Sequence, residues 1–103
     1  RNSRRKKLTR GIWLYVKDKG EIPNTLDMAL KCQRWNTLPL SGGLLDQPAG
    51  MMNQLDYALR IFNALSEYEQ RRRAGGKEFQ EWQVKNKAVM NLVTDMVKET
   101  ADG

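Results

Sequence analysis

Apolar side chains recur at helical spacing in the first part of the chain. Between residues 8 and 17 they are separated by four, one and three positions, which places them on one side of a helix. A second helix is expected over residues 24–36, where Asn24 or Thr25 can cap the N-terminus and Pro39 stops the helix soon afterwards. The apolar positions that define the two helices are Leu8, Ile12, Trp13, Val16, Leu26, Ala29 and Leu30.

Two longer helices are predicted in the rest of the chain. One runs from about residue 46 to residue 73, with Asp46 as its cap and Phe62 at the centre of its apolar stripe, and the pair Gly75 and Gly76 ends it. The other runs without a break from about residue 77 to residue 98. No stretch alternates for long with the period of a strand, so we expect an all-α fold, a small four-helix domain.

The last predicted helix is apolar on two sides, whereas a small domain needs one such side for its own core. A second exposed row of apolar side chains usually marks a contact with a partner. Tryptophan is enriched among the residues that dominate binding energy at interfaces. The candidate protein-binding residues are therefore Trp82, Val84, Ala88 and Leu92. In the alternative, which stays open, the helix is central and has neighbours on both sides.

Residues 37–47 form the one marked interruption between helices. Four leucines make this segment too apolar for a loose linker, and Gly42 and Gly43 permit backbone angles that other residues resist. We expect an ordered Leu/Gly-rich loop whose leucines pack into the core.

Positive charge is concentrated at the start of the chain. The sequence has 18 Lys and Arg residues against 12 Asp and Glu residues, and six of the cations fall within the first ten positions. We expect a flexible basic arm over residues 1–7 and a single helical domain over residues 8–103. The arm could neutralise phosphates of a nucleic acid, and the candidate residues for that role are Arg1, Arg4, Arg5, Lys6, Lys7 and Arg10.

Several classes of function are excluded or left without support by composition. The chain has no histidine and one cysteine, which excludes Ser-His-Asp and Cys-His nucleophile pairs and a His/Cys zinc cluster. No set of carboxylates at converging positions predicts a metal or an acid–base pair. We therefore expect a protein that is not an enzyme and has no catalytic residue, metal or cofactor. No apolar run approaches the length that spans a bilayer, so no membrane partner is expected.

One segment resembles a known group of proteins. Residues 35–48, Trp-Asn-Thr-Leu-Pro-Leu-Ser-Gly-Gly-Leu-Leu-Asp-Gln-Pro, resemble a pattern in small proteins of the virion-assembly gene modules of tailed bacteriophages, some of which look like tail assembly chaperones. The usual pattern has a bulky aromatic residue near Gly50 and Met51 and lacks the arginine-rich start. The motif residues are Trp35, Pro39, Gly42, Gly43, Asp46 and Gln47.

The resemblance implies a helical protein that binds other phage proteins, in which Asp46 caps a helix and Gln47 hydrogen-bonds the loop. It implies a role in virion or tail assembly, with phage structural or assembly proteins or a second copy of the chain as partners. The place of action would be the host cytoplasm during assembly, or the virion itself. The alternative is a small nucleic-acid-binding or regulatory protein that uses the basic arm.

Overall fold

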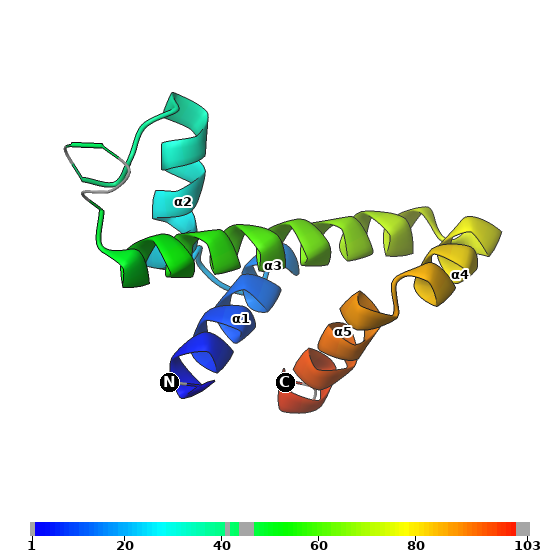
Figure 1. Cartoon of the computed structure of the whole chain (residues 1–103). Helices are drawn as coiled ribbons and strands as arrows, with labels where there is room; N and C mark the ends of the chain where they lie inside the picture. The colour runs from blue at the N-terminus through cyan, green and yellow to red at the C-terminus, as the bar shows by residue number, and fades with distance from the viewer. Residues whose placement is uncertain (1, 41, 44–46, 101–103) are drawn as a thin grey trace.

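The fold is helical throughout the residues that the structure describes. The structure, a computed structural model, describes residues 2–40, 42–43 and 47–100 (Figure 1). Within these ranges the chain forms five helices and no strand, which confirms the all-α class but not the count of four. The helices are α1 (Asn2–Val16), α2 (Asn24–Trp35), α3 (Ala49–Ala74), α4 (Gly76–Lys85) and α5 (Lys87–Thr100).

The 26-residue helix α3 is the element on which the others are arranged. In Figure 1, α2 rises from one side of α3, whereas α1 and α5 both leave its opposite side, so that the start of α1 and the end of α5 lie on the same side of the molecule. Helices α1 and α2 pack mainly against α3, and α5 contacts α3, α1 and α4. The result is an elongated molecule of 47 × 27 × 22 Å.

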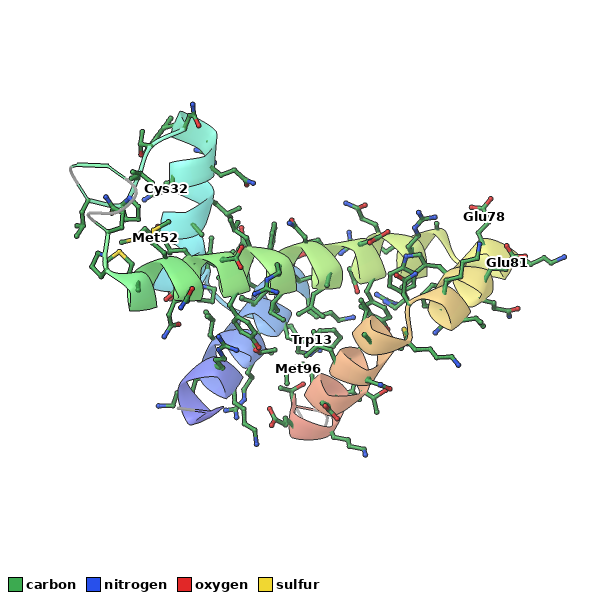
Figure 2. The ribbon with its side chains drawn as sticks, viewed as in Figure 1. Trp13, Cys32, Met52, Glu78, Glu81 and Met96 are labelled. Atoms are coloured by element: carbon green, nitrogen blue, oxygen red, sulfur yellow. The ribbon has the colours of Figure 1, made fainter. Side chains whose placement is uncertain are left out.

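The core lies where α1, α2 and α5 meet α3. The largest side chains that are fully buried are Ile12 from α1, Leu26 from α2 and Leu65 from α3. Trp13 from α1 and Met96 from α5 are also buried, and their side chains lie between these two helices (Figure 2). Phe62, expected at the centre, is only half-buried and packs at the edge of the core, 6.3 Å from the ring of Tyr15.

Helix α1 begins earlier than the sequence predicts. Residues 2–7, expected to be a flexible arm outside the domain, are its first turns in the structure, so the domain does not start at Leu8. Lysine and arginine are good helix formers, and the folded part of α1 downstream removes the cost of starting a helix. The guanidinium of Arg5 also lies 4.6 Å from the centre of the Tyr57 ring of α3, a contact that ties this end of α1 to the domain.

The single helix expected over residues 77–98 is two helices. Asn86 separates them: its φ of −122° and ψ of 53° are not helical, and its side-chain amide donates a hydrogen bond of 2.8 Å to the carbonyl of Trp82. Asparagine competes in this way with the regular backbone bonds of a helix. The carbonyl of Asn86 then accepts a bond from the amide of Met90, which starts α5.

The turn from α3 to α4 depends on two glycines, at the position where the sequence predicts the end of the helix. Gly75 has φ 67° and ψ −162°, and Gly76 has φ 75°. A side chain would strain both conformations, whereas glycine adopts them readily. This turn allows α4 to fold back beside the end of α3, as Figure 1 shows.

Candidate protein-binding surface

The four candidate protein-binding residues do not form one surface. The break at Asn86 puts Trp82 and Val84 on α4 and Ala88 and Leu92 on α5. Val84 is 69% exposed and Ala88 is exposed, but Leu92 is half-buried and Trp82 is buried. The prediction of a continuous apolar face on one helix is therefore wrong. The four residues belong to two helices, and Trp82 is buried in the fold.

Trp82 belongs to an aromatic cluster that joins α1, α3 and α4. Its ring stacks with Phe79 at 6.4 Å and approaches Tyr68 at 6.3 Å, and Tyr68 in turn lies 6.1 Å from Trp13. The indole nitrogen of Trp82 donates a hydrogen bond of 3.1 Å to a carboxylate oxygen of Glu67. Burial in this cluster raises the pKa of Tyr68. The cluster fastens α4 to α3 and is structural.

The largest exposed aromatic side chain is Trp35, at the C-terminal end of α2. It is 61% exposed, and Met28, one of the other exposed apolar residues, lies seven positions earlier on the same helix. Seven residues are close to two helical turns, so the two side chains leave α2 on the same side. The buried residues Leu26 and Ala29 face α3 from the other side of the helix. Met28 and Trp35 thus form an outward apolar face, here called the α2 face.

Next to Met28, at the N-terminal end of the α2 face, lies a groove between the middle of α1 and the starts of α2 and α3. It has a volume of about 550 Å³, and its apolar walls come from Leu8, Met28, Met51 and Leu55. Lys7 adds one positive charge to its lining. Methionine side chains adapt to differently shaped apolar partners, which suits a binding groove. Met28 belongs to both the groove and the α2 face and joins the two.

After α2 the chain is held by a buried glutamine. The amide of Leu40 donates a bond of 2.9 Å to the side-chain oxygen of Gln47, whose nitrogen donates to the carbonyls of Leu40 and Gly43 at 2.9 and 3.2 Å. Gln47 therefore does hydrogen-bond the loop. Of the leucines expected in the core, Leu38 is half-buried and Leu40 is largely exposed.

The other motif residues have varied environments. Pro39 is half-buried, and Gly42 and Gly43 are exposed. The residue that precedes α3 is Pro48, whose carbonyl accepts a bond from the amide of Met52 and whose own side chain makes no capping bond. Asp46, the predicted cap, lies outside the described residues.

The basic residues of α1 differ in how they are engaged. Arg5 stacks on Tyr57, and Arg10 forms an ion pair of 3.8 Å with Glu99 of α5. Lys6 and Lys7 are exposed. Of the remaining two candidates, Arg4 is in the first turns of α1, and Arg1 lies outside the described residues.

One charged cluster was missed by sequence reasoning. The buried carboxylate of Glu69 on α3 accepts hydrogen bonds from Lys17 at 3.2 Å and from Arg72 at 2.8 and 3.2 Å, and Arg73 lies 3.4 Å away. The bonds from Arg72 and then Lys17 lower the pKa of Glu69 to about 2 despite its burial. Because Lys17 follows α1, the cluster, here called the Glu69 clamp, ties α1 to α3.

Neither a group of metal-ligating side chains nor a membrane-spanning helix is found in the described part of the chain. Over residues 2–40, 42–43 and 47–100, no group of three or more side chains is arranged to hold a metal ion. Within the same ranges no helix is long and apolar enough to cross a bilayer. No protein-family model, curated protein or solved structure matches the chain.

Proposed function

We propose that this chain is a non-enzymatic bacteriophage protein that acts in virion assembly, in the tail branch of that process, by binding other phage proteins. The observation that carries the proposal is the exposure of Trp35, because a tryptophan that is 61% exposed has a large surface to bury against a partner. It begins the segment, residues 35–48, that resembles phage assembly proteins.

The α2 face is the surface assigned to the partner. Trp35 and Met28 supply the apolar contact, and the adjoining groove supplies a concave site for a partner side chain. Interface energy concentrates in a few large side chains around which weaker contacts exclude water. The hydrogen bonds of Gln47 hold Leu40, itself exposed, in a defined conformation near the end of α2. The chain would act in the host cytoplasm while the virion assembles.

The test uses the virion proteins encoded beside the gene for this chain. Each is co-expressed with the tagged chain, and complexes are isolated by size-exclusion chromatography. We expect one of them to co-elute with the chain, and Trp35→Lys to abolish the complex while circular dichroism shows an unchanged fold. The matched control is Val84→Lys, which puts the same charge on an equally exposed apolar site of α4. The proposal fails if no neighbouring gene encodes a virion protein, or if Val84→Lys and Trp35→Lys have the same effect.

A second candidate function is nucleic-acid binding by α1, favoured by the exposed neighbours Lys6 and Lys7 on a helix that has no acidic residue. Each lysine that contacts a phosphate releases counterions and makes binding weaker in salt. Deleting residues 1–10 would be a poor test, because it removes the buried Leu8 and Thr9.

The better test of that candidate is Lys6→Gln with Lys7→Gln, measured by the fluorescence anisotropy of a labelled DNA duplex. This candidate function predicts that DNA binding weakens as the salt concentration rises. The double variant should reduce the slope of log K against log salt concentration by about two. A DNA affinity that the double variant leaves unchanged would contradict it.

A further inference from the structure

A second groove lies on the opposite side of the molecule, between α1 and α5. Its volume is about 620 Å³, and part of α3 forms its base. Helices α1 and α5 leave α3 on the side opposite α2 (Figure 1). Tyr57 of α3 and Leu92 and Met96 of α5 provide its apolar lining. We call it the α1–α5 groove.

The two edges of the α1–α5 groove have opposite charge. Arg5 and Lys6 line it from α1, whereas Asp95 and Glu99 line it from α5. Lys98 lies beside the two acidic residues and leaves the α5 edge with one net negative charge. The groove therefore has a basic edge and an acidic edge on either side of an apolar lining.

Not all of these charges are satisfied within the chain. Glu99 pairs with Arg10 at 3.8 Å, and Arg5 stacks on Tyr57. Among the side chains that the structure describes, neither Lys6 nor Asp95 has an ion-pair partner. Lys6 and Asp95 are thus exposed charges of opposite sign at opposite edges of the same groove, and the exposed Lys98, also without an ion-pair partner among the described side chains, shares the α5 edge with Asp95.

We propose that two copies of the chain form a dimer through their α1–α5 grooves. A two-fold axis along the groove places the basic edge of each copy against the acidic edge of the other, because the rotation exchanges the two sides. Lys6 of one copy then meets Asp95 of the second, and the reverse pair forms by symmetry. Leu92, which lines the groove from α5, then faces α1 of the second copy.

The groove favours a second copy over a nucleic acid. Asp95 and Glu99 line it, and both would repel a phosphate backbone that entered along the basic edge. The formal net charge of +6 opposes dimer formation, but at physiological salt charges more than about 8 Å apart are largely screened. Whether two copies associate therefore depends on the contacts at the edges of the groove. The α2 face takes no part, so the dimer does not depend on the proposed phage partner.

The experiment exchanges the two charges. We expect the full chain to dimerise in sedimentation-velocity centrifugation, and Lys6→Glu or Asp95→Lys alone to weaken the dimer about tenfold, because each puts two like-charged pairs at the interface. Lys6→Glu has this effect although it lowers the net charge. When the two variants are mixed, the mixed dimer should form with an affinity near that of the unchanged protein, since both of its charge pairs are again opposite in sign.

The controls are Lys77→Glu and Glu81→Lys on α4, which make the same changes of charge away from the groove; Figure 2 places Glu81 at the far end of the molecule. They should leave the dimer unchanged. Misfolded variants would not regain dimer formation when they are mixed. Circular dichroism of each variant checks its fold separately. A chain that stays monomeric at millimolar concentration overturns the proposal. So does a dimer that Lys6→Glu leaves intact, or a mixture of the two variants that does not associate.

Discussion

Helices α1 and α2 on the one hand, and α4 and α5 on the other, are held against α3 in different ways. Helices α1 and α2 bury Ile12 and Leu26 completely against α3, where Ala58 and Leu65 are also fully buried. Helices α4 and α5 bury Trp82, Val93 and Met96, but none of these three is completely buried. The comparison indicates that the α1–α2–α3 part carries most of the stability. The α4–α5 part is attached by fewer side chains, and its divergence from α1 leaves the α1–α5 groove open.

The largest expected effect is a loss of stability in the α1–α2–α3 part. Leu65→Ala removes a completely buried side chain of α3 from the core, and such changes cost about 2–5 kcal/mol. We expect the upper end of that range, because no part of Leu65 is exposed to solvent. Total stability of a small domain is about 5–15 kcal/mol, so thermal unfolding should shift strongly. Met96→Ala in α5 is the matched control, and its loss of stability should lie near the lower end of that range. Equal losses of stability for the two variants, measured by urea unfolding, would contradict the difference between the two parts.

The Glu69 clamp should make the same part of the molecule sensitive to acid. The pKa of Glu69 is lowered to about 2 in the folded chain from 4.5, so its contribution is present at neutral pH and is lost as the pH falls from about 4.5 to about 2. A difference of this size amounts to about 3 kcal/mol. Since the carboxylate is buried, little of this is lost to solvent screening.

Glu69→Gln tests that prediction. At pH 7 the variant should be less stable than the unchanged protein by about 3 kcal/mol, and the two should converge near pH 2. Urea unfolding at a series of pH values measures the difference, which removes the contribution of the other carboxyl groups. A gap between the two proteins that stays constant from pH 7 to pH 2 would show that the clamp does not depend on the charge of Glu69.

A smaller, local effect is expected in the segment between α2 and α3. Gln47→Ala removes the acceptor of the Leu40 amide and both bonds that the Gln47 side chain donates. Hydrogen bonds of this kind are worth about 0.5–1.5 kcal/mol each. The amide of Leu40 should exchange with solvent much faster in the variant, while amides in α1 and α3 keep their rates. Unchanged exchange at Leu40 would mean that the glutamine does not order this segment.

Regular apolar spacing made much of the fold predictable. The expected bounds of α2 and α3 agree with the structure to within a few residues, because Asn36 and the pair Gly75 and Gly76 end these helices by their own backbone preferences. The start of α1 was missed, since residues 2–7 have no apolar spacing and become helical through contacts such as that of Arg5 with Tyr57. The break at Asn86 was missed because apolar residues at helical spacing lie on both sides of it.

Features that depend on contacts distant in sequence were the hardest to predict. Glu69 follows Leu65 by four residues on the buried stripe of α3, a position that could have identified it as a buried charge. The sequence does not show that Lys17, 52 residues away, completes its environment. Trp82 was assigned to a partner surface because its spacing cannot distinguish a partner from Tyr68 and Phe79. The role of Trp35 in binding stays a prediction.

Native-state hydrogen exchange tests the central comparison most directly. It measures the free energy of opening at each amide, which ranges from near zero at mobile positions to the full stability in the core. At a concentration where the chain is monomeric, the amides of Ile12 and Leu65 should open only by global unfolding, whereas those of Val93 and Met96 should open at a lower free energy. Equal opening free energies in α3 and α5 would contradict the account, because the two parts would then unfold as one unit.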